Sequence, residues 1–553
     1  MRTTATRRHW FKRAAAILAL GLVAAACGGG GDDDGGGGGG GSSSSDDAGT
    51  PTPGGRVVYG LEAETTDGWC LPEAQLAISG IMVADTIYDT LTRPNAEGVV
   101  EPWLAESVEP NEDSTVWTIK LREGVKFHDG TDLTAEVVKN NLDAYRGAYP
   151  TRSPLLFVFV FEPIQSVDVV DPLTVQVTLK QPWVSFDNAL WQSGRLGILA
   201  QAQLDDTSSC AENLIGTGPF KLVDWVPNQK FEAEKNPDYW ATDAAGNQLP
   251  YLDAIEFRPI VEVDQRLNAL ESGEINAMHT SDAATVSDLR DRSDSGEVNA
   301  YESEEFGEVS YVMLNESKPP FDNIKARQAV AYAVDFDETN AILNDGITTQ
   351  ATGPFAPGNI GNLDDTGFPT YDPDEAERLV AEYEEETGQP LSFTYTTTNA
   401  QVTIEQGQLL KEQAEAVGMS VEIVTVDQST QIDTAISGDF EAIGWRNHPG
   451  GDPDQQYNWW KSGSPVNFGR FSDPEIDRLL DEGRTTTEGR EQIYEDLNRR
   501  FAEEVHNVWS WYTPWTVAMA TDVHGVPGEG PTSAEPFPGL ATGHLVTYMW
   551  VEQ

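Results

Sequence analysis

The chain has 553 residues, too many for a single hydrophobic core and enough for two to four domains. Its 90 acidic and 35 basic residues give a formal net charge of −55, so its surface repels nucleic acid and anionic lipid, and we exclude both as partners. Apolar residues make up 39% of the chain, a proportion typical of globular proteins and unlike membrane bundles or disordered chains.

The N-terminal segment predicts export. A basic stretch is followed by small or apolar residues from Ala14 to Ala26, which as a helix would rise only about 20 Å, too short to span a bilayer. Residues 1–26 therefore predict a signal peptide. The adjacent arginines Arg7 and Arg8 leave both general and twin-arginine export open.

The small residues before Cys27 resemble a lipoprotein cleavage site, in which the cysteine thiol is acylated and becomes the mature N-terminus. The alternative is ordinary cleavage nearby, which leaves a freely secreted protein. Residues 27–54 are rich in Gly, Asp and Ser and have no apolar face to offset the entropy of ordering. We expect a disordered tether of about 30 Å root-mean-square length that holds a folded domain at the extracytoplasmic face of the membrane.

Two further cysteines, Cys70 and Cys210, suggest one disulfide in an exported protein. Two unpaired buried cysteines are the alternative. Since the sequence contains no CxxC motif and no Cys/His cluster, we expect neither a structural metal nor a cofactor.

Short strand and helix patterns alternate from Gly55 onward and predict an α/β architecture with mixed sheets. Residues 115–121 alternate as a strand, and a turn then returns the chain into residues 125–127, which predicts a hairpin. The next turn contains His128, which we interpret as a turn-capping side chain and not as a ligand.

A second hairpin is predicted from residues 221–225 and 230–235. The glycines Gly216 and Gly218 before it lack the third glycine of a dinucleotide-binding loop and indicate a tight backbone crossing.

Three later patterns predict other elements. Helical periodicity begins at Thr134, and residues 173–180 alternate as a strand. A cap, a first-turn proline and a capping-box Glu open a helix at Asp372 that ends at Gly388, and a similar signal opens another helix at residues 472–475.

Five stretches, in order along the chain, resemble solute-binding protein family 5, the peptide/nickel type of ABC transporter binding proteins. They are residues 101–146, 213–240, 252–277, 311–338 and 451–484. The resemblance implies a bilobed, periplasmic-binding-protein-like α/β fold of type II in its large three-segment form, with mixed sheets and a two-strand hinge.

The same resemblance implies domain limits and a function. Lobe I would combine residues 55–98, 200–305 and 517–553, with residues 99–199 as an accessory domain and residues 306–516 as lobe II. The implied function is that of a monomeric substrate-binding protein of an ABC importer. It captures a small, peptide-like solute between its lobes and delivers it to the transmembrane permease subunits.

Peptide-binding relatives present an Asp to the peptide ammonium just before an Asp-Pro pair. Here Asp452 keeps that pair, but the upstream acid is replaced by Arg446, Asn447 and His448, and the run is one residue longer. A guanidinium and an imidazole favour an acidic or neutral ligand group. The alternative is that Arg446 points to solvent or pairs with a nearby acid. Trp445 matches the motif position beside the cleft and is a predicted ligand wall.

Other candidate ligand contacts are implied by position alone. Glu62, Glu64 and Trp69 lie in a run that corresponds to a cleft-lining segment of relatives, where either Glu could supply a displaced ammonium anchor. Asn467 lies in a family-like Asn-Phe-Gly-Arg-Phe run. Solvated acids and ordinary packing are the alternatives for these residues.

Three rival functions stay open, one of which is a sensor or chaperone-like scaffold that binds a solute without transporting it. A secreted hydrolase lacks support, because no HExxH, GxSxG or P-loop motif occurs, although carboxylates are plentiful enough to hide an acid/base pair. Binding of a non-peptide solute or of a metal chelate is the third, because nickel binders share the family. His448 alone is placed to contact such a chelate.

Overall fold

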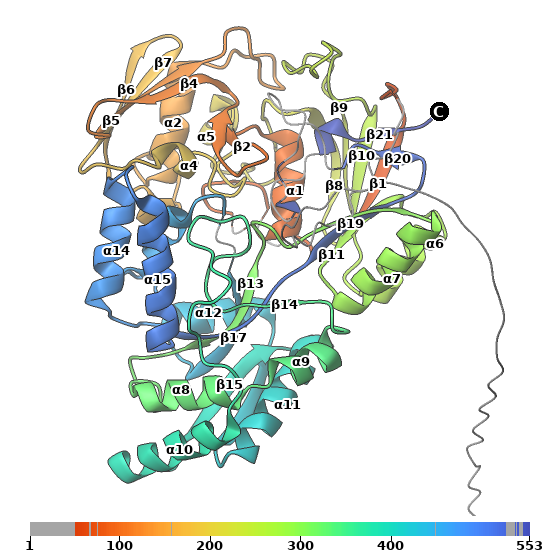
Figure 1. Ribbon diagram of the computed structural model, residues 1–553. Helices are drawn as coiled ribbons and strands as arrows, with labels where there is room; N and C mark the ends of the chain where they lie inside the picture. Colours follow the sequence, from red (N-terminus) through yellow and green to blue (C-terminus); the bar gives the residue numbers. More distant parts are fainter. Residues whose placement is uncertain are drawn as a thin grey trace, which may run out of the picture. The chain divides into compact units, whose positions relative to one another are not determined.

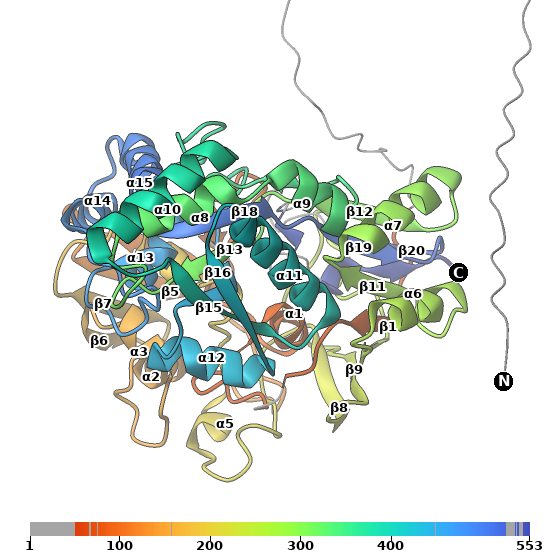
Figure 2. The ribbon, with the colours of Figure 1, turned by 90° about the horizontal axis from the view of Figure 1, so that it is seen from below.

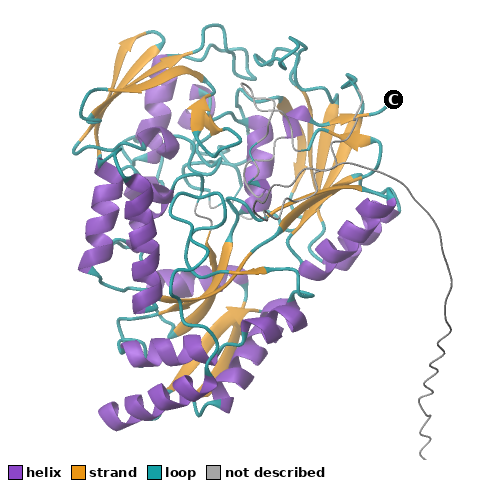
Figure 3. Cartoon of the chain, in the orientation of Figure 1, coloured by secondary structure: helices purple, strands orange, loops and turns teal. Residues whose placement is uncertain are grey.

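Two large mixed β-sheets with helices packed against them form the framework of the protein (Figure 1, Figure 3). The structure is a computed structural model that describes residues 50–553 except residues 66–67, 75, 156, 448–449, 527–536, 538 and 541–545. The predicted signal peptide, Cys27 and most of the predicted tether therefore lie outside the described residues. Residues Thr50–Gln553 form one compact unit.

The first sheet, which we call the lobe I sheet, has seven strands in the order β12-β19-β11-β1-β10-β9-β8. Its central strand β1 runs parallel to β10 and β11, and the remaining pairs are antiparallel. The strands are β1 (Arg56–Leu61), β8 (Phe220–Val226), β9 (Lys230–Lys235), β10 (Ala254–Pro259), β11 (Ala277–Thr280), β12 (Asn299–Ser303) and β19 (Trp515–Met519). Helices α1 (Ile78–Ile87), α6 (Val263–Glu271) and α7 (Ala283–Ser295) pack against it.

The second sheet, which we call the lobe II sheet, has six strands in the order β14-β18-β13-β17-β15-β16. Strand β15 runs parallel to β16 and β17, whereas β13 is antiparallel to β17 and β18. The strands are β13 (Val309–Leu314), β14 (Thr349–Gln350), β15 (Ser392–Thr398), β16 (Ser420–Val426), β17 (Ala442–Asn447) and β18 (Asn507–Tyr512).

The helices of lobe II alternate with its strands along the chain, and Figure 2 shows α8 to α11 lying together beside its sheet. They are α8 (Ile324–Ala333), α9 (Phe336–Leu343), α10 (Pro373–Thr387), α11 (Gln401–Ala416), α12 (Gln428–Ser437), η1 (Pro453–Gln456), α13 (Tyr457–Trp460), α14 (Pro474–Thr485) and α15 (Arg490–Glu504).

A third, antiparallel sheet has the order β4-β5-β7-β6, and we call it the accessory sheet. Its strands and the shorter elements near it are β2 (Thr92–Pro94), β3 (Val100–Pro102), β4 (Ala105–Pro110), β5 (Val116–Leu121), β6 (Ile164–Asp171), β7 (Thr174–Leu179), α2 (Ala135–Tyr145), α3 (Phe157–Val160), α4 (Phe186–Ala189) and α5 (Gln201–Asp205). Near the C-terminus lie η2 (Val546–Tyr548) and the pair β20 (Val523–His524) and β21 (Trp550–Val551).

Buried apolar side chains divide between two main cores. One core joins residues of the lobe I sheet, such as Val57 and Phe257, to residues of the accessory sheet, such as Trp117 and Val177. The other belongs to lobe II and includes Val312 and Tyr395. Because the accessory sheet shares its core with lobe I, those two parts pack as a continuous body, and lobe II has a separate interior.

The chain crosses between the two large sheets along two neighbouring paths. One crossing leads from β12 through residues 304–308 into β13, and the other leads from β18 through residues 513–514 into β19. The two crossings touch, because the Thr513 N–H donates to the Glu308 carbonyl at 2.9 Å. Trp515 already pairs with Ser303 in the lobe I sheet, two residues before the predicted start of that segment. The predicted domain limits otherwise stay predictions.

Several local predictions match the structure. Thr134 caps α2 by accepting from the Val137 N–H, and Asp372 caps α10, which ends at the left-handed Gly388. The hairpin of β8 and β9 forms, and so do β5 and β7.

The glycine crossing is also present and is tight. A Cβ on Gly216 would lie 1.9 Å from the Ile87 carbonyl oxygen, so only glycine fits there. His128 lies in its predicted turn and contacts the Gly218 carbonyl oxygen through Nε2 at 3.0 Å. Burial lowers the pKa of His128 to about 4, as expected for a structural imidazole.

The predicted hairpin between residues 115–121 and 125–127 was wrong. Strand β5 pairs instead with β4 on one side and with β7 on the other. Residues 125–127 turn away, and Lys126 makes a single bridge to Asp132. Alternation showed that residues 115–121 are a strand, but the partner of a strand depends on segments far away in sequence.

Candidate functional site

The edges at which the two large sheets meet carry the candidate site. The carboxyl ends of parallel strands lie at one edge of a sheet, and in open α/β sheets ligands bind beyond that edge. In lobe I, Glu62 follows β1 and Ser281 follows β11. In lobe II, Arg446 lies near the end of β17. The Arg446 Nη1 donates to Ser281 Oγ at 3.4 Å, so these two edges face each other across the lobe boundary.

Arg446 is positioned by its strand register. Arg446 pairs with Ser310 of the neighbouring strand β13. Glu308 comes two residues before Ser310, so it lies on the same face of the lobe II sheet as Ser310. Arg446 Nη1 is 3.3 Å from Glu308 Oε2. The charge of Glu308 is the main cause of a raised pKa at Arg446; burial opposes the shift and Glu62 adds to it.

The exposure of Arg446 shows what it faces. Its side chain is 46% exposed, yet burial still disfavours its charge. The guanidinium thus lies among groups of both lobes while nearly half of its surface stays accessible. We call the region that Arg446, Glu308 and Glu62 share at the lobe boundary the recess. Arg446 therefore pairs with a nearby acid, Glu308, which was the alternative interpretation. Much of its guanidinium nevertheless stays open to the recess.

Glu308 supplies the acid of this pair from the crossing between the lobes. Its side chain is only 11% exposed. Its Oε2 accepts no hydrogen bond within the described part of the chain, although the Arg446 guanidinium lies close by. A buried carboxylate oxygen without a hydrogen bond is stabilised only by the nearby positive charge, and burying it in this way costs free energy.

Glu62 faces the same recess from lobe I. Its N–H donates to His279 Nε2 at 3.3 Å, which fixes the backbone at the end of β1. Burial raises the pKa of the half-buried Glu62 carboxyl, the charges of Arg446 and Arg266 lower it, and Glu308 raises it further. No described residue donates a hydrogen bond to its carboxylate, so this predicted contact is free to receive a ligand group.

Trp445 and Asn447 flank Arg446 on β17. The Trp445 ring packs edge-on against Phe468 at a centroid distance of 5.8 Å and remains half-buried. Asn447 Nδ2 donates to Gln456 Oε1 at 2.8 Å. His448, predicted beside them, lies outside the described residues.

Two predicted ligand contacts in lobe II have structural partners instead. Asp452 is 5% exposed and holds Arg490 by two bonds of 2.7 Å, and it also caps η1 through the Asp454 N–H. Asn467 is 2% exposed, and its Nδ2 donates to the Phe471 carbonyl at 3.0 Å. These contacts give both side chains structural roles inside lobe II, although the buried Asn467 Oδ1 has no hydrogen-bond partner among the described residues. Their role as ligand contacts stays a prediction.

Two predicted contacts in lobe I, Trp69 and Glu64, also have structural partners. Trp69 is 1% exposed and packs edge-on against Trp225 and Phe231 in the core. Glu64 accepts from its neighbour Thr65 and from the Asn228 N–H in the turn between β8 and β9. Both side chains stabilise lobe I locally.

The predicted disulfide between Cys70 and Cys210 is present in the structure. Glu73 lies close enough to both sulfurs to form a three-residue cluster with them. The sulfurs are bonded to each other, so they offer no thiolate to a metal ion.

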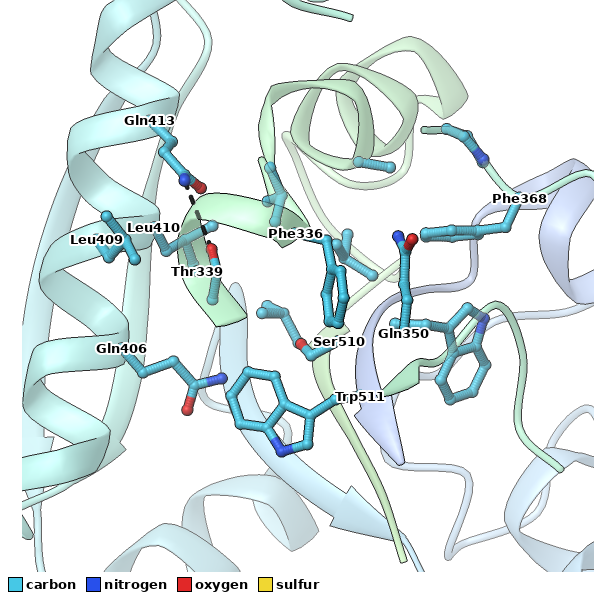
Figure 4. Close-up of a pocket in the computed structure, with 16 residues that line it drawn as sticks. Phe336, Thr339, Gln350, Phe368, Gln406, Leu409, Leu410, Gln413, Ser510 and Trp511 are labelled. Carbon is cyan, nitrogen blue, oxygen red and sulfur yellow. Dashed lines mark hydrogen bonds between the residues drawn. The ribbon is translucent and has the colours of Figure 1, made fainter. Parts of the chain in front are cut away.

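A separate recess lies in lobe II between α9, α11 and β18 (Figure 4). Phe336, Leu409 and Trp511 line it together with polar groups, among which Gln413 Nε2 donates to Thr339 Oγ1 at 3.5 Å. Its volume of about 30 Å³ holds a water molecule or two and no peptide-sized solute. The candidate site therefore stays at the facing sheet edges.

Comparison with known proteins identifies the family. Residues 99–468 match the family described as bacterial extracellular solute-binding proteins, family 5. The chain belongs to this family. No helix among the described residues of this family 5 protein is long and apolar enough to cross a membrane.

Individual relatives show which part of the family it resembles. The chain is 32% identical over 329 residues to the glutathione-binding protein GsiB of Pectobacterium atrosepticum. The aligned region covers 59% of this chain and 60% of that protein. The match thus spans less than two thirds of the length of that relative.

Solved structures of the same fold cover more of the chain. The oligopeptide-binding protein AppA from Bacillus subtilis, in complex with a nonapeptide, has a TM-score of 0.77 at 22% identity, covering 91% of this chain and 100% of AppA. NikZ from Campylobacter jejuni, in complex with Ni(L-His), has a TM-score of 0.72 at 22% identity, covering 86% and 95%. These neighbours are bilobed binding proteins, so the predicted bilobed α/β fold is confirmed.

Sequence reasoning missed three residues of this family 5 site. Glu308 and Ser281 lie next to strand ends, but nothing in their local sequence distinguishes them from other acids and hydroxyls. Arg195 lies in a loop before α5, and burial lowers its pKa to about 10 against the opposing charge of Glu308. Only the fold brings these residues to one place.

Proposed function

We propose that this family 5 protein is the substrate-binding lipoprotein of an ABC importer, which captures a small, peptide-like solute between lobes I and II and delivers it to the permease. The observation that carries the proposal is the meeting of the two sheet edges at Arg446 and Ser281. Charged groups of both lobes, Glu62 from one and Arg446 with Glu308 from the other, face the recess there.

The two neighbouring chain crossings, residues 304–308 and 513–514, would act as the hinge between the lobes. A two-strand connection allows one lobe to rotate against the other, which is how hinge-closing binding proteins enclose their ligands. A solute that touches both lobes stabilises the closed arrangement and is released intact when the lobes separate. This mechanism requires binding and release, and no bond is made or broken in the solute.

Relatives support the ligand class. The GsiB protein is named for glutathione, and the AppA structure contains a nonapeptide, so polar, peptide-like solutes fit this fold. In this chain the groups facing the recess are charged, which suits a small solute with polar ends.

The N-terminal sequence supports the location. The lipoprotein-like site at Cys27, after a signal peptide, would attach the protein to the outer face of the cell membrane, and residues 28–49 would serve as the tether. There it would act as a monomer beside the transmembrane subunits of its permease.

Native mass spectrometry of the purified mature protein tests the proposal. The expected result is a bound small solute that is recovered chemically unchanged, and whose readdition to protein stripped by unfolding and refolding gives binding heat. Titration of the stripped protein with nickel and L-histidine should give no heat. A ligand returned as a cleaved product would contradict transport in favour of hydrolysis, and nickel-dependent heat would favour a metal chelate.

A further inference from the structure

Arg195 carries a positive charge that the protein leaves largely uncompensated. Its Nε donates to the Leu76 carbonyl at 3.1 Å. Among the residues that the structure describes, no carboxylate lies within ion-pair distance of its guanidinium, and Nη1 and Nη2 have no partner. The side chain is half-buried, and burial lowers its pKa to about 10, with only the charge of Glu308 acting in the other direction.

Such a state is unexpected in a chain with 90 acidic and 35 basic residues. Three other arginines with little exposure have a carboxylate at close range: Arg327 with Glu316, Arg484 with Asp454 and Arg490 with Asp452. Arg266, which is 2% exposed, has no ion-pair partner among the described residues, but it donates to three backbone carbonyls, those of His279, Ile260 and Val261. Removing a guanidinium from water without a counter-charge is costly, and Arg195, which donates to a single backbone carbonyl, keeps donors that a ligand can use.

The position of Arg195 indicates where that partner comes from. Two residues earlier, Ser193 Oγ donates to Gln455 Oε1 of lobe II at 3.1 Å, so this segment touches the opposite lobe. Glu308 influences the pKa of Arg195 and is also the ion-pair partner of Arg446. The charge of one mostly buried carboxylate thus acts on two guanidiniums, one on each side of the lobe boundary, but forms an ion pair only with Arg446.

We propose that Arg195, together with Arg446, binds a carboxylate of the captured solute, so that the site selects solutes by their carboxylate and not by an ammonium group. This proposal rests on the proposed function, because it assigns the specificity of the same cleft. The guanidinium presents parallel N–H donors that match the two oxygens of a carboxylate, and such charge-assisted pairs are strong when partly desolvated. A carboxylate that entered the recess would supply the counter-charge missing at Arg195 and share Arg446 with Glu308.

Calorimetry with three forms of one probe tests the proposal. The probes are trialanine, N-acetyl-trialanine and trialanine amide. The acetylated peptide should bind as tightly as trialanine, and the amide should bind about ten to a hundred times more weakly, the range of one charge-assisted pair. Tight binding of the amide together with loss of the acetylated form would overturn the carboxylate assignment and leave the transport function intact.

Variants separate the role of Arg195 from a role in folding. R195Q should reduce the preference for trialanine over its amide, since Arg446 remains, and R195K should restore part of it. R122Q is the matched control, because Arg122 is also half-buried and donates to one backbone carbonyl, that of Trp103. The ratio of the two affinities does not depend on the amount of folded protein, so an unchanged ratio in R195Q would refute the proposal.

If none of the three peptides binds, the peptide-like part of the proposed function fails, and a second readout decides the inference. Thermal unfolding is then compared for glutarate and its diamide at equal concentration. Stabilisation by the acid and not by the amide, lost in R195Q and kept in R122Q, supports carboxylate recognition. No difference between acid and amide overturns it.

Discussion

The Trp183 indole donates from Nε1 to Asp454 Oδ2 at 2.5 Å, which joins the chain next to the accessory sheet to lobe II through a buried contact. The same carboxylate accepts from Ser185 Oγ at 3.0 Å and from Arg484 Nε at 2.8 Å. Arg484 also lies over the Trp183 ring at 4.4 Å. The chain next to the accessory sheet and lobe II therefore share a buried contact that depends on the charge of Asp454.

Replacing this carboxylate should destabilise the protein strongly. D454N leaves the Arg484 guanidinium, whose side chain is 2% exposed, without its counter-charge. We expect the free energy of unfolding to fall by about 3–5 kcal/mol, the cost of breaking a buried pair from one side. Urea unfolding followed by tryptophan fluorescence measures the change.

The control for this variant is D481N. Asp481 pairs with Lys461 and accepts from the Tyr457 hydroxyl, but its side chain is 54% exposed. Because exposed pairs contribute little, the loss should stay below about 1 kcal/mol. Equal losses in the two variants would show that burial of the Asp454 contact does not determine its contribution.

The pH dependence of stability should show a contribution from the titration of His506. Burial alone would lower its pKa, but the hydrogen bonds that the imidazole donates to the Asp473 and Glu316 carboxylates outweigh it and raise the pKa above its ordinary value. A raised pKa in the folded state contributes stability that is complete below the unfolded value of about 6.5 and is lost as the pH rises through the folded value. The melting temperature should therefore fall between pH 6 and pH 9, and H506Q should reduce that fall.

The partner of His506 acts at the other end of the pH range. Burial opposes ionisation of Asp473, but bonds from His506, Glu475 and Arg500 lower its pKa well below the ordinary value. Its contribution is present above the unfolded pKa of about 4 and is lost as the pH falls. D473N should flatten the acidic limb between pH 5 and pH 3. An unchanged basic limb in H506Q together with an unchanged acidic limb in D473N would rule out this network as the source.

Glu308 should act as an internal competitor of the ligand. If a solute carboxylate binds Arg446 and Arg195, E308Q removes the negative charge that both now share. We expect trialanine to bind E308Q several-fold more tightly than the unmodified protein, and trialanine amide to be affected less. Weaker binding of trialanine to E308Q in calorimetry would instead assign Glu308 a direct contact with a cationic ligand group.

The disulfide should contribute to stability through the unfolded state. It links residues 140 apart in sequence, and the chain-entropy model assigns a closed loop of this size about 5 kcal/mol. The mature protein without Cys27 should show no free thiol until it is reduced. The double variant C70A/C210A should unfold at lower urea concentration, and two titratable thiols in the oxidised protein would contradict the bridge.

Predictions from the sequence succeeded where the cause is local. The caps at Thr134 and Asp372 depend on residues three positions away. The tight backbone crossing at Gly216 was predicted from two glycines close together in a turn. The partner of residues 115–121 could not be predicted, since β7 lies more than fifty residues further along the chain, in the register Trp117 to Val177.

The site shows the same division. Arg446 stood out because it replaces an acid in a recognisable motif, and the structure places it in the recess. Asp452 stood out because it keeps the Asp-Pro pair of the same motif, but the sequence does not show that the fold pairs it with Arg490 of α15. Arg195 has no motif at all. Arg195 became a candidate because no carboxylate pairs with it among the described residues. That absence depends on which residues the fold brings near it and not on its neighbours in the sequence.

The last residues of the chain lie against the first described ones. Thr52 Oγ1 donates to the Val551 carbonyl at 2.8 Å, and Gln553 Nε2 donates to the Pro53 carbonyl at 3.1 Å. A biotin or dye placed after Gln553 would therefore sit within a few ångströms of the place where residues 1–49 join the folded unit. Coupling the protein to a sensor chip through its C-terminus would present the cleft to solution in much the same orientation as attachment through Thr50.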